Sequence, residues 1–296
     1  MTLADILKQL PETDREIQAK EPPPQTPEEQ KRRRRDQYPD SWGNASKFSG
    51  PDPALARKLV AEVFAGGRDR IIELIRILDS PADYKPEYLL HCLAILGNEK
   101  DQRLLVRTMS TQLGTSQARA ILIRELQFIG SDDAVKALAK YLSDDNSCDD
   151  VARALTAIGS NTAAAEFRKA FPKSTGKCRV TIAQNLGVFR DTKSVDLLRA
   201  ALRESEPDLR LVAGWALARI GDAQSADALI KTADSAQGHP RAKATSTVLL
   251  LAETLAMQGK KSEAARIYNH LLNTRTDPAE KYVRDAAARH ITVFML

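Results

Sequence analysis

The chain has 296 residues and a mass of 32.6 kDa, and 43% of its residues are hydrophobic, 28% charged and 5% aromatic. Its apolar residues are mainly Ala, Leu, Ile and Val, a composition that favours helices over sheets. No stretch approaches the roughly 18 uninterrupted apolar residues that argue for a membrane-spanning helix. The net charge of +5 is a mild basic bias, well short of a histone-like charge.

The amino-terminal sequence and the cysteines both indicate a reducing compartment. The first 20 residues carry acids and bases throughout and lack the continuous apolar run of a secretory signal, so we expect a cytoplasmic protein. Cys92, Cys148 and Cys178 are an odd number scattered through helical patterns. This usage predicts reduced, buried thiols and argues against a disulfide framework or a zinc site.

Residues 1–50 differ in composition from the rest of the chain. A short amphipathic helix is predicted from Leu3 to Leu10 and ends at Pro11. Residues 11–45 are rich in Pro and charge and poor in apolar side chains, which predicts a linker or a disordered tail. The tail contains the basic run Lys31, Arg32, Arg33, Arg34 and Arg35. This run is either a contact for nucleic acid or another polyanion, or a solvated segment balanced by neighbouring acids.

From Pro51 onward, helical periodicity is broken at short intervals by Gly, Asp, Asn and Ser, and no alternating β pattern occurs. Five similar segments align so that one residue of each falls in a single column, at intervals of 33, 29, 31 and 31 residues. The column residues are Gly97, Gly130, Gly159, Arg190 and Gly221. So constant a period predicts a solenoid of repeated helix pairs.

Each repeat has the same predicted construction. An apolar helix ends at the column residue, where glycine can take the left-handed C-cap conformation. Apolar residues 5, 8 and 12 positions after the column fall on one face of a second helix, which only stacking of neighbouring repeats can bury. The residue after the column has a side-chain oxygen that can cap this second helix. These capping residues are Asn98, Ser131, Ser160, Asp191 and Asp222.

One repeat carries a family resemblance. Its matching residues, within residues 207–233, are Asp208, Arg210, Ala213, Ile220, Gly221, Asp222 and Leu229. In this pattern the chain resembles the short HEAT-like repeat first described in phycobilin lyases, over about residues 51–236. The resemblance implies an all-α fold, an α-solenoid of stacked antiparallel helix pairs. The repeat arginine, Arg119, Arg179 or Arg210 in three copies, is replaced by Cys148 in another, and we expect it to bond an acid or a cap of the adjoining repeat.

After Pro240 the spacing changes. The residues that match a second pattern are Leu251, Ala252, Leu255, Gly259, Ala264, Tyr268 and Leu272. This segment resembles one tetratricopeptide repeat, which also stacks antiparallel helix pairs. We therefore predict a tail at residues 1–50, a HEAT-like solenoid at residues 51–236 and a tetratricopeptide-like pair with a terminal helix at residues 237–296. The apolar carboxyl end either packs back on the last helices, or meets another chain, or precedes a continuation of the protein.

No pattern typical of catalysis or of metal binding occurs. His91, His239, His270 and His290 are far apart and form no ligand pair, while His91 and Cys92 lie in an apolar run that predicts core positions. No nucleophile elbow, Walker A loop or dinucleotide fingerprint is present. We therefore expect no catalytic residue, no metal and no cofactor.

Basic residues recur at one position of the second helices. They stand ten residues after the column in four of five copies, with further bases close by. The resemblance implies that second helices line the concave side, so these residues could form a basic stripe on an inner surface. The alternative is an ordinary solvated helix face in a highly charged chain. The candidate stripe comprises Arg103, Arg107, Lys136, Lys140, Lys169, Arg199 and Lys231.

These observations favour a non-enzymatic scaffold or adaptor that binds a protein or peptide along a solenoid groove. The alternative is a solenoid that associates with nucleic acid or another polyanion through the stripe and residues 31–35. A remote alternative, raised only by the resemblance, is a lyase-type or lyase-chaperone subunit. The sequence does not identify the partner. We also expect Trp215 to be largely buried at a repeat junction, where its removal would cost about 3–5 kcal/mol.

Overall fold

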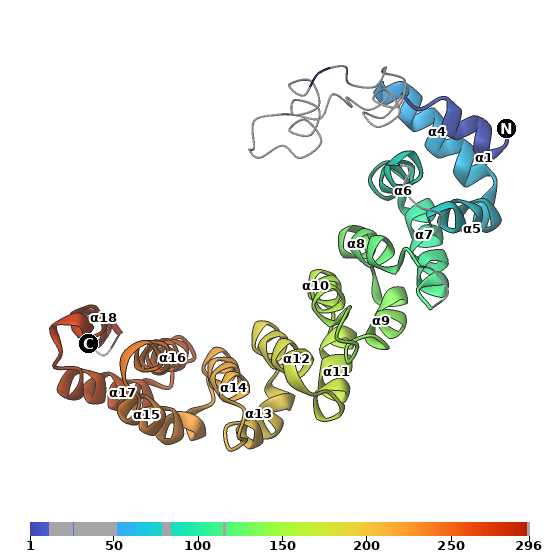
Figure 1. Ribbon diagram of the computed structural model, residues 1–296. Helices are drawn as coiled ribbons and strands as arrows, with labels where there is room; N and C mark the ends of the chain where they lie inside the picture. The colour runs from blue at the N-terminus through green and yellow to red at the C-terminus, as the bar shows by residue number, and fades with distance from the viewer. Residues whose placement is uncertain (12–25, 27–51, 79–83, 115–116, 295–296) are drawn as a thin grey trace. The chain divides into compact units, whose positions relative to one another are not determined.

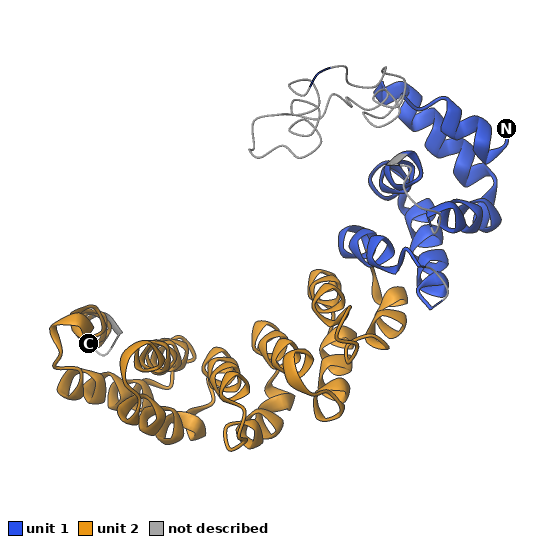
Figure 2. Cartoon of the chain, in the orientation of Figure 1, with its two compact units in different colours: residues 1–129 blue, residues 130–296 orange. Residues whose placement is uncertain are grey.

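A computed structural model describes residues 1–11, 26, 52–78, 84–114 and 117–294 (Figure 1). Most of the predicted tail, including the basic run at residues 31–35, lies outside the described residues. The chain divides into two compact units, residues 1–129 and residues 130–296 (Figure 2). The three-part division expected from composition and repeats stays a prediction.

Unit 1 begins with a short helix that packs against three others. Thr2 caps α1, because its hydroxyl accepts a hydrogen bond from the Asp5 backbone N–H at 3.1 Å. Leu3 and Ile6 are fully buried against α4, α5 and α6, so the predicted amphipathic helix is confirmed. The helices of this unit are α1 (Leu3–Lys8), α4 (Pro53–Ala65), α5 (Gly67–Leu78), α6 (Tyr84–Leu96), α7 (Glu99–Gln112) and α8 (Arg119–Ile129).

Unit 2 continues the same construction. Its α-helices are α9 (Asp132–Ala139), α10 (Cys148–Ile158), α11 (Asn161–Ala170), α12 (Gly176–Val188), α13 (Val195–Ala201), α14 (Pro207–Ile220), α15 (Ala226–Ser235), α16 (Gly238–Met257), α17 (Lys261–Thr274) and α18 (Lys281–Phe294). Short 3₁₀ turns are η1 (Phe171–Lys173), η2 (Thr192–Ser194), η3 (Ala223–Ser225) and η4 (Pro278–Glu280). Within unit 1 the described helices α4 to α7 form two consecutive pairs, and within unit 2 the helices α10 to α17 form four, followed by α18. The predicted all-α solenoid of stacked helix pairs is confirmed, and the described residues contain no β-strand.

The helices of unit 2 lie in two layers. In the first layer α10 packs on α12, α12 on α14 and α14 on α16. The second layer contains α11, α13, α15 and α17 (Figure 1). Within residues 130–296, the first layer lies on the inner side of the bend that the unit follows. The expectation that second helices line the concave side is therefore wrong for this unit, because α11, α13 and α15 lie in the outer layer.

The turns follow the predicted pattern only in part. Gly159, Gly221 and also Arg190 have positive φ angles of 68°, 80° and 49°, whereas Gly97 and Gly130 do not take this conformation. The Asn98 and Ser160 side chains cap their helices by accepting from the backbone N–H groups of residues 101 and 163. Ser131, Asp191 and Asp222 accept no such hydrogen bond, so their predicted capping role is wrong. Both aspartates are bonded to arginines instead.

The cysteines also differ from expectation. Cys148 and Cys178 form a disulfide with a Cα–Cα distance of 5.6 Å, so the prediction of reduced thiols is wrong for this pair. Stacking of α10 on α12 brings their first turns within the usual Cα separation of a disulfide, which a count of cysteines does not reveal. Cys92 is a free, buried thiol as predicted, and burial raises its pKa. No described helix is long and apolar enough to cross a membrane.

Gly187 on α12 permits the close approach of α14. A Cβ atom at this position would lie 2.7 Å from the Ala216 Cα and 2.8 Å from the Trp215 Cζ3, so the helices would have to separate. We expect Gly187→Ala to lower the free energy of unfolding by about 1–3 kcal/mol, the usual cost of overpacking. Urea denaturation followed by circular dichroism measures this change.

Gly214→Ala provides the matched control. Gly214 is also buried inside a helix, but its new Cβ would meet the Leu229 Cδ2 at 2.9 Å, which is the end of a flexible side chain. We therefore expect Gly214→Ala to be close to neutral, because the gain in helix propensity offsets the small adjustment. Equal destabilisation by both substitutions would contradict the assigned role of Gly187.

Candidate functional site

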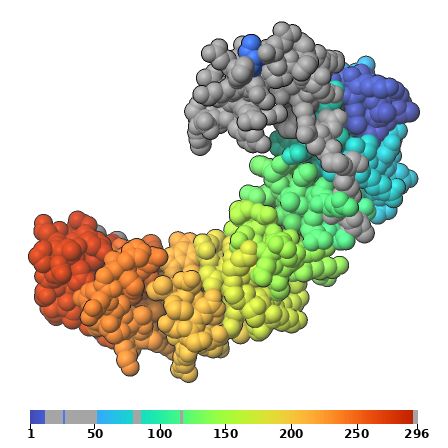
Figure 3. All heavy atoms as spheres, in the orientation of Figure 1, coloured from blue at the N-terminus to red at the C-terminus, as the bar shows by residue number. Residues whose placement is uncertain are grey.

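A groove of about 870 Å³ lies across the first layer of unit 2. Its lining residues come from α10, α12, α14, α16 and the turn before α14. Figure 3 shows that the repeats of unit 2 form a continuous stack. The apolar part of the lining consists of Val180, Leu211, Val212, Trp215, Ala242 and Leu250. The polar part consists of Asp149, Lys177, Thr181, Glu206, Asp208, His239, Lys243, Ser246 and Thr247.

Trp215 is the aromatic residue of the apolar lining. It packs at the junction of α12 and α14, as predicted, and the half-buried indole also lines the groove. One edge lies against Gly187, and the Arg219 guanidinium lies 5.5 Å from the ring centroid. These contacts orient the ring and leave part of its surface open. A half-buried tryptophan in a groove is a typical anchor for a partner.

The groove lining also includes unpaired charges. Lys177, Asp208 and Lys243 are exposed, Glu206 is half-buried, and none of the four forms an ion pair with another described residue. Both signs of charge are therefore available to a ligand that covers the aliphatic side chains. Apolar contacts with a polar rim are the usual composition of a protein-binding site.

Arginine–aspartate pairs hold successive repeats behind this groove. Arg168 donates to the Asp191 Oδ1, and Arg199 Nε donates to the Asp222 Oδ2 at 2.8 Å. Each arginine lies nine residues after its column and each aspartate one residue after the next column. The two aspartate side chains are only 10% and 9% exposed, so these pairs fix the turns of η2 and η3. These regular offsets were visible in the sequence, but an aspartate directly after a helix is also typical of an N-cap, and the two aspartates were therefore predicted to be caps.

The repeat arginines of the first helices form a second set of contacts. Arg179 forms a bidentate ion pair with Glu204, with N–O distances of 2.7 and 2.6 Å. This contact agrees with the expectation that the repeat arginine bonds an acid of the adjoining repeat. Arg119 and Arg210 instead donate to backbone carbonyls of the turns that precede them, those of Leu113 and Glu204. These contacts fix the turns that lead into α8 and α14.

The Arg199–Asp222 pair predicts an acid-sensitive contribution to stability. Burial is the largest effect and acts to raise the pKa of Asp222, but the hydrogen bonds from Arg199 and Ser225 and the Arg199 charge together lower it from 3.8. The stabilisation is therefore present above the unfolded pKa and is lost as pH falls through the folded pKa. We expect the melting temperature of the wild type to exceed that of Asp222→Asn at pH 7, with the gap closing below about pH 4. Thermal melts between pH 7 and pH 3 measure the gap, and a constant gap would contradict it.

The candidate basic stripe is divided between the units. Arg103 and Arg107 are exposed on α7 in unit 1, where Arg103 pairs with Glu99. In unit 2, Arg199 is half-buried on Asp222, and Lys169 pairs with Glu166 at 2.6 Å. Three stripe residues of unit 2 are exposed and form no ion pair with a described residue. These are Lys136, Lys140 and Lys231. A binding role for the stripe stays a prediction.

The histidines form no catalytic arrangement. His91, predicted as a core residue, is half-buried, and its Nδ1 lies 2.9 Å from the buried Glu125 carboxylate, which Arg124 also contacts. Within the described residues, no group of three or more His, Cys, Asp or Glu side chains could hold a metal ion. The clusters of titratable groups in these residues are contacts between helices.

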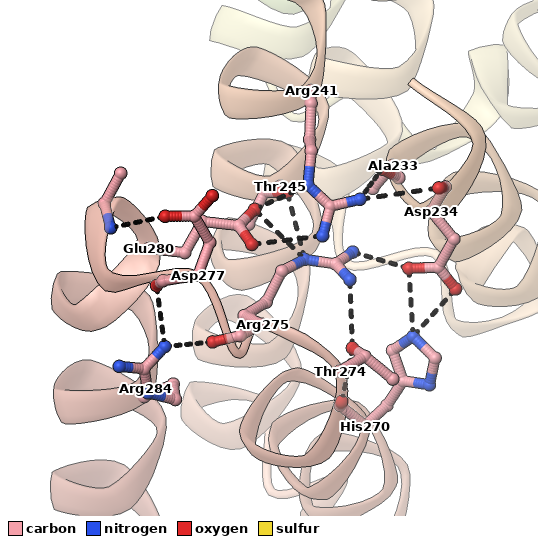
Figure 4. A network of polar contacts seen from close by, with 11 residues as sticks. Ala233, Asp234, Arg241, Thr245, His270, Thr274, Arg275, Asp277, Glu280 and Arg284 are labelled. Atoms are coloured by element: carbon pink, nitrogen blue, oxygen red, sulfur yellow. Dashed lines mark hydrogen bonds and ion pairs between the residues drawn. The ribbon is translucent and has the colours of Figure 1, made fainter. Parts of the chain in front are cut away.

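A polar network joins α15, the amino-terminal half of α16 and the segment after α17 (Figure 4). The Arg275 side chain is 1% exposed, and its Nη2 lies 2.7 Å from the Asp234 Oδ1. Its Nε donates to the Thr245 hydroxyl at 3.2 Å, and Glu280 lies 3.8 Å away. Arg241 on α16 forms a bidentate ion pair with the same Glu280. The network therefore links α16, which lines the groove, to α15 and α17 behind it.

Comparison with known proteins confirms the predicted HEAT-like repeats. The family of HEAT repeats matches residues 173–249, which contain most of the groove. No curated protein matches the sequence. An engineered protein of known structure is 20% identical with a TM-score of 0.40, over 80% of this chain and 73% of that one. The complex of CpcE and CpcF of phycocyanin lyase from Nostoc sp. PCC7120 is 18% identical with a TM-score of 0.33, over 78% of this chain and 96% of that one.

Proposed function

We propose that this HEAT-like repeat protein is a non-enzymatic scaffold that binds a protein or peptide in the groove of α10, α12, α14 and α16. The observation that carries the proposal is the half-buried Trp215, which lines the groove together with aliphatic side chains and unpaired charges of both signs. HEAT repeats supply a rigid row of helices for such a surface.

The groove favours a segment with apolar side chains over a small polar molecule. Leu211, Trp215 and Leu250 offer an apolar surface to the ligand, while Lys177 and Glu206 can pair with its flanking charges. Burial of an aromatic anchor supplies most of the affinity in such complexes, and rim charges mainly set the orientation and the association rate. A short amphipathic helix or an extended peptide satisfies both requirements.

A polyanion-binding role for the stripe is the second candidate. Exposed Lys136, Lys140 and Lys231, which form no ion pair with a described residue, support it. Such binding weakens steeply with ionic strength, because each neutralised phosphate releases counterions. Binding in the groove loses much less affinity, and a salt series therefore separates the two functions. A lyase-type role rests on the family resemblance alone.

The compartment is part of the same proposal. A cytoplasmic location stays a prediction, whereas the Cys148–Cys178 disulfide is typical of proteins in oxidising surroundings. We propose that the protein functions where this disulfide can form.

A peptide library tests the groove directly. Panning random 12-residue peptides against the full chain, with Trp215→Ala as the subtraction target, selects sequences that need the indole. Trp42→Phe, which replaces the other tryptophan of the chain, leaves Trp215 as the sole fluorescent reporter. A blue shift and weaker acrylamide quenching on titration with a selected peptide would support the groove.

The opposite result is equally clear. If panning returns only acidic peptides whose binding disappears with Lys136→Glu and Lys140→Glu and leaves Trp215 emission unchanged, the stripe is the binding surface. The groove proposal then fails. Binding that survives both sets of substitutions would place the site elsewhere on the chain.

A further inference from the structure

The disulfide lies in one wall of the groove. Cys148 is the first residue of α10 and Cys178 the third residue of α12, and each is 1% exposed. The residues next to them, Asp149 and Lys177, both line the groove. The covalent bond therefore fixes the relative position of two groups that a ligand would contact.

The disulfide also stands where other repeats use arginine. Cys148 occupies the position of Arg119 and Arg210, each eleven residues before its column residue. Those arginines donate to carbonyls of the turn six residues earlier, at 2.8 Å for Arg119 and 2.7 Å for Arg210. At the repeat that begins with α10, a covalent bond to α12 replaces this hydrogen bond to the preceding turn. The connection between α10 and α12 at this junction therefore depends on the redox state of the two cysteines.

Two hydrogen bonds also join α10 and α12. The Thr181 hydroxyl donates to the Asp149 Oδ1 and the Thr156 hydroxyl to the Asn185 Oδ1, both at 2.6 Å. In addition, α10 packs less extensively on α12 than α12 packs on α14. The Asp145 Oδ1 lies 3.3 Å from the Cys178 Sγ and would accept a hydrogen bond from its thiol after reduction. The reduced Cys178 thiol would therefore keep a hydrogen-bond partner.

We propose that the Cys148–Cys178 disulfide is a redox-responsive tie that holds the groove in its binding form. The oxidised tie fixes Asp149 and Lys177 before a ligand arrives, so less ordering is needed on binding. Reduction frees the first turns of α10 and α12 and lowers the affinity of the groove. The inference rests on the proposed peptide-binding function, and it deepens that function by naming its regulation.

Reduction needs a dithiol as the electron donor. A thiolate of the dithiol attacks one sulfur, breaks the S–S bond and forms a mixed disulfide, and the second thiol then closes the donor into its own cyclic disulfide. The protein disulfide gains two electrons and two protons and becomes two thiols. Both sulfurs are buried, so the attack requires transient opening of a first turn.

Thiol titration and hydrogen exchange test the tie without any ligand. Because the chain has three cysteines, we expect one titratable thiol in denaturant before treatment with dithiothreitol and three after treatment in native buffer. Exchange of the amides at residues 149–153 and 178–182 should accelerate on reduction, while that of α17 stays unchanged. We also expect the melting temperature to fall by roughly 6–12 °C.

Peptide affinity tests the regulation. A groove peptide from the panning experiment should bind the oxidised protein about five- to tenfold more tightly than the reduced protein, at the low end of couplings between sites. Cys92→Ser should leave this ratio unchanged. Cys148→Arg with Cys178→Ser restores the arginine of the other repeats and should bind with no redox dependence.

Three results would overturn the proposal: three free thiols before reduction, a disulfide that resists dithiothreitol in native buffer, or unchanged exchange at α10 and α12 after reduction. Failure of the oxidised protein to bind any groove peptide is a different result. It removes the proposed function, whereas the exchange data still decide whether the tie responds to reduction.

Discussion

Trp215→Ala is expected to weaken binding of a groove peptide by about 30-fold or more, while the fold persists. Removal of an aromatic anchor at the centre of an interface typically costs at least about 2 kcal/mol, and each 1.4 kcal/mol is tenfold in affinity. The indole is half-buried, so its loss should destabilise the free protein by less than the roughly 3–5 kcal/mol typical of a fully buried aromatic. Isothermal titration and thermal melts of the same variant separate these effects.

Met257→Ala is the control for this prediction. Met257 is 66% exposed at the end of α16 and does not line the groove. We expect its replacement to change peptide affinity by less than about twofold, because a side chain outside the contact gains little on binding. If Met257→Ala and Trp215→Ala weaken binding equally, the ligand covers a different surface. If Trp215→Ala binds normally, the groove is not the site.

Arg275→Ala is expected to have the largest effect on stability. Removal of one member of a buried ion pair typically costs about 3–5 kcal/mol, because the remaining charge loses its partner. Asp234 is 38% exposed and Glu280 keeps Arg241, so both acids retain some compensation. We therefore expect a cost near the lower end, about 3 kcal/mol, and a melting temperature lower by roughly 6–12 °C.

Arg266→Ala on α17, the helix that Arg275 directly follows, is the matched control. Arg266 pairs with Asp227 at 2.6 Å, but the two side chains are 53% and 84% exposed. Exposed pairs contribute little because water and salt screen them, so the expected cost is below about 1 kcal/mol. Comparable losses in the two variants would show that burial of Arg275 does not decide the stability of this network.

Much of the architecture could be predicted from the sequence because it depends on local rules. The recurring column predicted where helices end, and the left-handed conformations of Gly159 and Gly221 follow from the absence of a Cβ atom. Apolar spacing predicted which face of each second helix is buried, as at Val135 and Leu138. A repeated unit that cannot bury its apolar face alone must stack, and this requirement determined the fold class.

The candidate site depended on contacts between repeats, which one sequence does not specify. Trp215 was recognised as important, but only the packing of Gly187 on α14 decided that the indole lines a groove. The same four-residue spacing that predicts a buried helix face also describes Leu211 and Trp215 on the opposite, groove-lining face.

The bonding partners of Asp222 and Cys148 were likewise decided by the tertiary structure. An aspartate after a turn is typical of a helix cap, yet Asp222 binds Arg199, which lies 23 residues earlier. Cys148 finds Cys178 because stacking of α10 on α12 brings their first turns together. Local propensity acts over a few residues, whereas these contacts depend on how one repeat is placed on the next. The sequence by itself therefore determined the helices and the repeat, and only the tertiary structure decided the groove and its disulfide.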